Sequence, residues 1–466
     1  MKIGLVGPSY QQRSLPFDAQ RLVNMYPILD DAGKEVASLF GTPGLSLFCD
    51  LVTTSGRKCF CAANGRAFVV SGNTLFEIES TGAFSNRGTL NTTTGNVTMA
   101  ENGVQLAVCD GADLYILTYA TNVFAQVTSA GLPSDVGQVT TIDGYFVVNE
   151  LNTGRFYISA LLDGTTWDAL DFATAEANPD NLLAVANSQG QLYLIGTRTF
   201  EVWTNTGSTT FPFQRISGAI GEIGIMAPDT IVDLDNTLIW VGRDKNGKGV
   251  VYRTNGFRPQ RISTEPIEIL LQGASDPLEM SAFSYQQDGH LFYIITGGGL
   301  STSICYDVTT GLWHERAYLN AGALEPHLAK DVMFAFDKHL VCDRQSGKVY
   351  ELSPTVYSDN GDEISRERIF THISDENKEI RYNRLELGVE TGVGLQTGQG
   401  SDPLISLRLS KDGARTWSDW YEADIGAAGQ YQTRVVFRRL GIADQMTFHI
   451  RITDPVKVAI TGAYLS

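Results

Sequence analysis

Cysteine and histidine are the residue types in this sequence best suited to bind a metal or act as a nucleophile. The 466-residue chain contains six of each. The only closely spaced cysteines are Cys59 and Cys61, and a C-x-C pair in an apolar strand differs from the C-x-x-C spacing of zinc sites. The histidines follow no metal-binding spacing such as H-E-x-x-H. We therefore expect no metal, no cofactor, and buried free thiols that suit a reducing compartment.

Motifs for nucleophilic catalysis or phosphate binding are also missing from the sequence. It contains neither a G-x-S-x-G elbow nor a Walker-type phosphate loop. Three glycines at 297–299 follow an apolar run, but Leu300 and Ser301 open no helix, so a hairpin tip is expected there. The 52 acidic side chains leave open a carboxylate pair for glycoside hydrolysis, because any two of them can meet in space. We expect no enzyme and no small-molecule substrate.

Two segments are similar to the Asp-box, S-x-D-G-x-x-T-W, of sialidase-type propellers. Residues 410–417 match it closely, and residues 163–167 form a looser copy. In such a turn the Asp accepts hydrogen bonds from backbone amides, the Gly takes a positive φ and the Trp packs beneath. The motif is therefore a structural hairpin turn, and a sialidase-like glycosidase remains only the less favoured alternative.

A repeated pair of strands supplies the framework for these side chains. An apolar strand, a Gly, Asn or Asp turn and a second strand with an aromatic residue recur along the chain. The aromatic residues are 39 to 54 residues apart: Phe76, Tyr115, Tyr157, Trp203, Tyr252, Tyr306 and Tyr350. The apolar strands are 66–70, 104–108, 144–148, 190–195, 236–241, 290–295 and 338–342.

A β unit of about 40–50 residues has the size of one propeller blade. We predict an all-β protein with a β-propeller of about seven (possibly six) blades. The apolar strand of each pair is expected to line the axis. Sustained helical periodicity is scarce, and residues 267–271 are the one segment expected to form a short helix.

The two ends of the chain differ from the repeats. We assign residues 1–65 to an N-terminal arm and propeller-closing strands, 66–364 to the propeller, and 365–466 to a C-terminal β-sandwich. Segments 22–28 and 45–61 are the candidates for closing the ring. The arm at 4–17 is polar and rich in turns, and is expected to order against a neighbouring subunit.

The charge distribution argues against nucleic-acid or membrane binding as the main function. The net charge is −17, whereas both phosphate binding and anionic lipid binding usually need a basic surface. The last 102 residues are neutral, with 13 basic and 13 acidic side chains, so the first 364 residues carry the whole excess. No run approaches 18 apolar residues, and the start is too short for a signal peptide, so we expect no membrane association.

Five segments resemble the packaged-DNA stabilisation proteins of short-tailed bacteriophages (podoviruses). They are residues 21–27, 41–45, 195–203, and the C-terminal stretches 450–452 and 460–462. The resemblance implies a structural virion protein assembled in the host cytoplasm, a homo-hexameric tail hub or nozzle below the portal adaptor ring. It further implies roles in retaining packaged DNA, holding the tail needle or plug and anchoring tailspikes. No catalytic residues carry over, and double-stranded DNA would pass without sequence-specific binding.

Three residues of the first matching segment, Arg21, Asn24 and Tyr26, are the candidates for a subunit interface. Packing of a closing strand is the alternative interpretation for them. An acidic wall around the bore of the ring would repel phosphates and let DNA slide. A glycan-binding propeller adhesin remains the alternative function.

Overall fold

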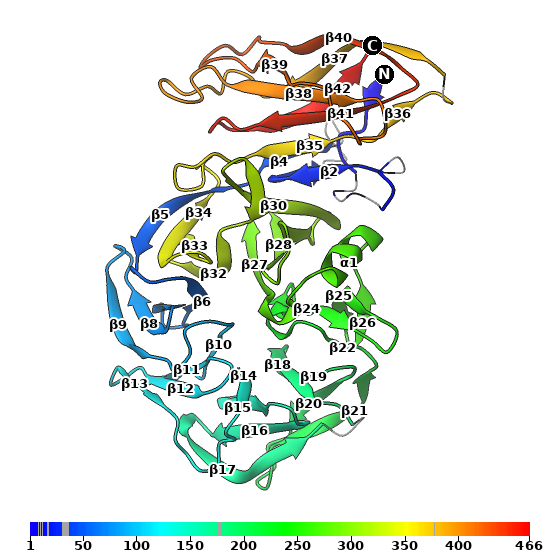
Figure 1. Cartoon of the computed structure of the whole chain (residues 1–466). Coiled ribbons are helices and arrows are strands. Elements are labelled where there is room, and N and C mark those ends of the chain that lie inside the picture. The colour runs from blue at the N-terminus through cyan, green and yellow to red at the C-terminus, as the bar shows by residue number, and fades with distance from the viewer. Residues whose placement is uncertain are drawn as a thin grey trace.

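The structure is a computed structural model that describes residues 1–7, 9, 11, 13–15, 18–29, 37–175, 179–376 and 378–466. Within these residues nearly all of the regular secondary structure is β-strand. Seven four-stranded blades surround an axis, and a β-sandwich lies beside one side of the ring (Figure 1). The predicted all-β propeller followed by a sandwich is therefore confirmed, and the blade number among the described residues is seven.

Each of the first four blades is a simple antiparallel meander. Their strands, from the axis outwards, are β6 (Gly56–Cys61), β7 (Ala67–Ser71), β8 (Thr74–Ile78) and β9 (Phe84–Thr89); β10 (Thr98–Glu101), β11 (Gln105–Cys109), β12 (Leu114–Thr118) and β13 (Val123–Gln126); β14 (Val136–Ile142), β15 (Tyr145–Glu150), β16 (Arg155–Ala160) and β17 (Asp163–Thr174); β18 (Leu182–Ser188), β19 (Gln191–Gly196), β20 (Phe200–Asn205) and β21 (Phe213–Gly221).

The last three blades carry the additions to this pattern. Their strands are β22 (Gly224–Ile225) and β23 (Val232–Leu234) with β24 (Thr237–Arg243), β25 (Lys248–Asn255) and β26 (Arg258–Arg261); β27 (Ser281–Gln287), β28 (His290–Thr296), β29 (Ser303–Asp307) and β30 (Leu312–Asn320) with β31 (Ala323–Pro326); β32 (Ala329–Ala335), β33 (Lys338–Asp343), β34 (Lys348–Ser353) and β5 (Gly44–Asp50). The helical elements are η1 (Pro228–Thr230), α1 (Glu265–Gln272) and η2 (Pro277–Glu279).

Tight turns join the first two strands of each blade. Asp143 and Gly144 have φ values of 50° and 86°, and Asp288 and Gly289 have 50° and 80°. Two successive positive φ values are the mark of a type I′ hairpin, whose twist matches that of the flanking strands. The short Asp-Gly pairs in the sequence therefore set the spacing of the strands.

The prediction that the apolar strands line the axis is wrong. Those segments form the second strand of each blade, such as β7 and β11, in which every residue is buried. The innermost strands are instead the less apolar β6, β10, β14, β18, β23, β27 and β32 (Figure 1). A second strand packs between neighbouring blades on both faces, whereas an innermost strand presents one edge and some side chains to the axial space.

The ring is closed by an N-terminal strand in the last blade. Strand β5 pairs antiparallel with β34, with Leu45 opposite Leu352 and Cys49 opposite Val349. The other candidate segment, 22–28, does not close the ring. It forms β2 (Arg21–Val23), which pairs with the outer strand β30 of the sixth blade and with a C-terminal strand, and most of β3 (Met25–Leu29), which pairs with β4.

The sandwich combines strands from both ends of the chain. One sheet contains β3, β4 (Ala37–Gly41), β42 (Ala459–Leu465), β37 (Ile380–Val389) and β40 (Val435–Ala443), with β1 (Lys2–Ile3) beside β42. The other contains β2, β35 (Arg366–Ile369), β41 (Gln445–Ile452), β38 (Leu404–Ser410) and β39 (Tyr421–Asp424), with β36 (Ile373–Ser374) beside β41. A single apolar core, including Leu385, Leu407 and Phe448, fills the space between them.

The remaining local predictions have mixed outcomes. The short helix expected at 267–271 is confirmed as α1. Residues 8, 10, 12, 16 and 17 of the expected arm lie outside the described residues, while β1 pairs with β42 of the same chain. Among the described residues, the helices all lack the length and apolar character needed to cross a membrane.

Candidate functional site

The predicted interface residues lie where the propeller meets the sandwich. Strand β2 runs parallel to β30, the outer strand of the sixth blade, and antiparallel to β35 of the sandwich. The Arg21 guanidinium donates to the Glu315 carboxylate through Nε and Nη2, both at 2.7 Å. The Glu315 side chain is only 3% exposed. This bidentate ion pair therefore connects β2 to the blade in a largely dry environment.

Asn24 and Tyr26 are buried within the chain. The Asn24 side chain donates to the carbonyls of Ala317 and Ser365, at 2.8 and 2.9 Å, and accepts from the Ala317 amide at 2.8 Å. The Tyr26 ring packs edge-on against Phe292, with a centroid distance of 5.4 Å. These two residues thus support the strand-packing interpretation. A contact with another subunit stays a prediction, and Arg21, with 29% of its side chain exposed, is the one that retains an accessible surface.

One continuous sheet extends this joint into the sandwich. Strands β30, β2, β35, β41 and β38 are neighbours in it. Glu367 on β35 accepts from His449 Nε2 at 2.9 Å, and Arg408 on β38 donates through Nε to His449 Nδ1 at 2.9 Å. Burial acts to raise the pKa of Glu367, but hydrogen bonds from His449 and Ser365, together with the nearby charge of Arg21, lower that pKa to about 2. Burial lowers the pKa of His449, and the imidazole that accepts from Arg408 is neutral.

Aromatic rings cover the outer end of this polar row. The Arg408 guanidinium lies 4.9 Å from the Trp417 ring and 4.6 Å from the Trp420 ring, and Arg451 lies 4.2 Å from Trp420. Arginine stacked on tryptophan is stabilised by the ring quadrupole and shielded from water. The side chains of Arg21, Glu315, Glu367, His449, Arg408 and Trp420 therefore form an ordered row along this sheet, which runs from the propeller into the sandwich.

Charged side chains are also buried on the opposite side of the joint. Arg316, Arg366 and Arg368 are each at most 1% exposed, and Asp359 is 1% exposed. Burial raises the pKa of Asp359 to about 7, against the opposing charges of Arg366 and Arg316. The sequence analysis missed this cluster. The alternation Arg366-Glu367-Arg368 is its only local signal, and alternating charges usually mark a solvated strand.

The Asp-box segments are structural turns, as predicted. The Asp412 carboxylate accepts from the amides of Arg415 and Thr416, at 3.0 and 2.9 Å, and Gly413 has a φ of 74°. In the looser copy, Asp163 accepts from the Thr165 amide at 3.0 Å and Trp167 is 5% exposed. There the positive φ, 58°, belongs to Leu162 instead of the glycine.

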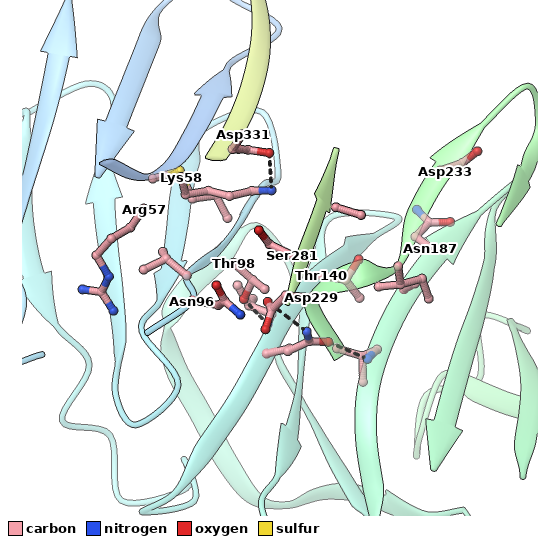
Figure 2. A pocket seen from close by; sticks show the side chains of 18 of the residues that line it. Arg57, Lys58, Asn96, Thr98, Thr140, Asn187, Asp229, Asp233, Ser281 and Asp331 are labelled. Carbon is pink, nitrogen blue, oxygen red and sulfur yellow. Dashed lines mark hydrogen bonds and ion pairs between the residues drawn. The ribbon is translucent and has the colours of Figure 1, made fainter. Parts of the chain in front are cut away.

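The axis of the propeller holds a polar cavity of about 200 Å³ lined by all seven blades (Figure 2). The Lys58 ammonium pairs with Asp331 at 3.2 Å, and Lys330 donates to Asn96 at 2.7 Å. Burial raises the pKa of Asp229, while the charges of Lys58 and Lys330 act in the opposite direction. Basic and acidic groups thus balance, and the cavity is suited to ordered water.

The Ser281 hydroxyl adds to the polar character of this cavity. Ser281 is 8% exposed, and its Oγ has no hydrogen-bond partner among the described residues. Arg57 instead points into the loop between the first two blades and donates to the carbonyls of Thr92, Thr94 and Gly95. Sequence reasoning missed the cavity because it placed the wrong strands around the axis.

Histidine and cysteine side chains have structural environments. His290 bonds to Asp307 at 2.8 Å and is buried. The described cysteines are free thiols, and burial raises the pKa of Cys109 and Cys305 to about 12, which makes the thiols poor nucleophiles. Within the described ranges, three or more His, Cys, Asp or Glu side chains do not gather in a way that could hold a metal ion.

Comparison with solved structures gives fold-level likenesses only. The chain is 9% identical to the N-terminal domain of Nup159, with a TM-score of 0.41, covering 74% of this chain and 99% of that one. It is 10% identical to the extracellular domain of the putative one component system BT4673 from B. thetaiotaomicron, with a TM-score of 0.45, covering 90% of this chain and 58% of that one. A search of curated proteins found no match.

Family models match both parts of the chain. The model described as bacteriophage P22 Gp10, beta-propeller, matches residues 1–357, and the one described as bacteriophage P22 Gp10, beta-sandwich, matches residues 365–466. Together they cover the seven blades and most of the sandwich, which are the two parts seen in the structure. The chain therefore belongs to the bacteriophage P22 Gp10 family, a family of structural proteins of the phage tail.

Proposed function

We propose that this chain is a subunit of a ring-shaped hub, or nozzle, in a short phage tail. In this role it helps retain packaged DNA, holds the tail needle or plug, and anchors tailspikes below the portal adaptor ring. Membership of the phage-tail family over both parts of the chain is the observation that carries the proposal. The subunits are assembled in the host cytoplasm and remain in the virion.

The axial cavity supports a ring of several chains. Its volume of about 200 Å³ is far too small for a DNA duplex, whose major groove alone is about 12 Å wide. DNA that leaves the particle therefore passes beside each propeller, through an opening bounded by several subunits. A closed ring needs two different contact patches per subunit, and we propose one on the propeller and one on the sandwich of each of six subunits.

The joint between propeller and sandwich favours such an assembly. Strand β2 bonds to both parts, and the Arg21–Glu315 pair and the Asn24 bonds to Ala317 and Ser365 fix their relative orientation. Two patches held at a fixed angle define how many subunits close a ring. The excess acidic charge of the first 364 residues would line the bore and keep the duplex from adhering.

The decisive experiment is electron microscopy of the purified chain, alone and with the portal adaptor ring, combined with native mass measurement. A six-fold ring with an acidic bore is expected, and particles assembled without the chain should lose their DNA. Two-fold dimers, or a neutral or basic bore, would contradict the proposal. Incubation with host polysaccharide tests the alternatives, since sugar release would indicate a glycosidase and tight glycan binding an adhesin.

A further inference from the structure

A basic cleft lies between the fourth and fifth blades of this otherwise acidic propeller. The turn between β19 and β20, residues 197–199, forms one wall, and the turn between β24 and β25, residues 244–247, forms the other. The cleft has a volume of about 610 Å³. Four cationic side chains line it: Arg198, Arg243, Lys245 and Lys248.

The two carboxylates that line the cleft accept hydrogen bonds from backbone amides. Asp180 accepts from the amides of Arg198 and Thr199, at 2.6 and 2.9 Å. Asp244 accepts from the amides of Asn246 and Gly247, at 2.7 and 2.8 Å, and these bonds lower its pKa. Both acids therefore stabilise the two turns, and their oxygens are directed at amide groups.

Three of the cations have no acidic partner among the residues that the structure describes. Lys245 pairs with Glu222 at 3.3 Å, but Arg198, Arg243 and Lys248 form no ion pair with a described carboxylate. Arg243 and Lys248 are also directly opposite each other in the β24–β25 ladder. Like charges in such a cross-strand pair are mutually destabilising unless an anion lies between or above them.

The backbone around the cleft is rigid enough to hold these groups in place. Arg243 Nε donates to the Thr197 carbonyl at 2.5 Å, which fixes the base of its guanidinium beside the opposite wall. A Cβ on Gly224 would lie 2.3 Å from the Arg198 amide nitrogen, so β22 packs closely under that turn. The remaining guanidinium N–H groups of Arg243 and the side chains of Arg198 and Lys248 are left for a ligand.

From this geometry we propose that the cleft binds phosphate groups, supplied either by a DNA backbone or by a small phosphate ester. Planar guanidinium groups bind two phosphate oxygens at once, and an ammonium adds a point charge beside them. The site makes no contact with bases, so it is indifferent to sequence. The proposal concerns the single subunit and does not depend on the ring proposed above.

The test uses the full-length chain and a variant with two of the cations removed, Arg198→Gln/Lys248→Gln. The matched control, Lys411→Gln/Lys457→Gln, removes the same charge from the sandwich. Binding of fluorescent 25-base-pair duplexes of two unrelated sequences is measured by anisotropy from low to moderate salt. For the cleft variant we expect about tenfold weaker binding or more at low salt, and a slope of log K against log salt that is shallower by about 2.

Competitors separate the two phosphate sources from general charge attraction. Displacement of the duplex by inorganic pyrophosphate supports one shared phosphate site. Pyrophosphate binding that is lost in the cleft variant, without any duplex binding, assigns the site to a small phosphate ester. The inference is overturned by absence of binding to both probes, by an equal loss in the control variant, or by equally strong competition from polyglutamate of the same charge. Thermal unfolding of each variant verifies that it is folded.

Discussion

The guanidinium of Arg21 and the carboxylate of Glu315 form a two-point ion pair, with both N–O distances at 2.7 Å, between the N-terminal strand β2 and the sixth blade. Nearly 300 residues separate the two in the sequence. The pair joins the segment that starts the chain to a blade that is built late in it. The same strand β2 pairs on its other side with β35 of the sandwich. Its removal should therefore weaken the whole joint.

We expect Arg21→Met to lower the free energy of unfolding by about 3 kcal/mol, because the buried Glu315 charge would keep only its bond from Thr302. Urea denaturation followed by tryptophan fluorescence measures this loss. The exposed Lys457–Glu390 pair, at 2.9 Å, is the matched control. Lys457→Met should cost less than about 1 kcal/mol. Equal effects of the two substitutions would show that Arg21 has no special role in the joint.

Asn24 combines three hydrogen bonds with a φ of 51°. Asn24→Ala removes the bonds and imposes a left-handed conformation on alanine, so a loss of about 3 kcal/mol is expected. Asn24→Gly loses the same bonds but adopts the positive φ freely, so it should be less destabilising by about 1 kcal/mol. Equilibrium denaturation of both variants isolates the backbone contribution. An alanine variant as stable as the glycine variant would contradict this assignment.

The closing strand β5 begins at a glycine with no room for a side chain. A Cβ on Gly44 would lie 2.4 Å from the Ser358 carbonyl oxygen and 2.7 Å from that of Val356. Gly44→Ala should therefore shift β5 and reduce stability by about 1–3 kcal/mol. Limited proteolysis should then cut more rapidly between β5 and β6. Gly247→Ala is the control, because no atom lies within 4 Å of its added Cβ. A Gly44→Ala variant as stable as the wild type would show that the closing strand can shift to accommodate a side chain at this position.

Because folding lowers the pKa of Glu367, we predict that the free energy of unfolding decreases as the solution becomes acidic. Hydrogen bonds from His449 and Ser365 outweigh burial and bring that pKa to about 2, below the ordinary value of 4.5. The unfolded chain thus binds more protons than the folded chain between these values. The stabilisation is present above about pH 4.5 and is lost as the pH falls towards 2. Glu367→Gln should remove up to about 3 kcal/mol at pH 6 and much less at pH 3.

Denaturation of the wild type and Glu367→Gln at several pH values measures this difference directly. Other carboxylates contribute equally to both proteins, so subtraction of the two curves isolates Glu367. Glu390, an exposed acid, gives the comparison variant Glu390→Gln, for which the difference should stay nearly constant with pH. A Glu367 difference that is also independent of pH would contradict the stabilisation of the Glu367 carboxylate by its hydrogen bond from His449.

Local chemistry in the sequence determined the parts of this protein that depend on neighbours along the chain. The Gly, Asn and Asp residues between paired strands predict the turns, the aromatic spacing predicts the blades, and the Asp-box residues predict the hairpin turn around Asp412. Each of these features involves contacts within a few residues, so residue type and spacing suffice to define it. The same holds for helix α1, whose apolar positions lie within eight residues.

Only the tertiary structure decided how these units meet. The sequence cannot tell which strand of a blade faces the axis. A continuous apolar segment shows only that a strand is buried on both faces, and does not show its position within the blade. It also cannot bring Arg21 to Glu315, or place β3 and β4 beside β42, because strand pairing is non-local and many registers satisfy the same alternation. The basic cleft arises in the same way, since Arg198 and Lys248 belong to different blades whose turns meet only through tertiary packing.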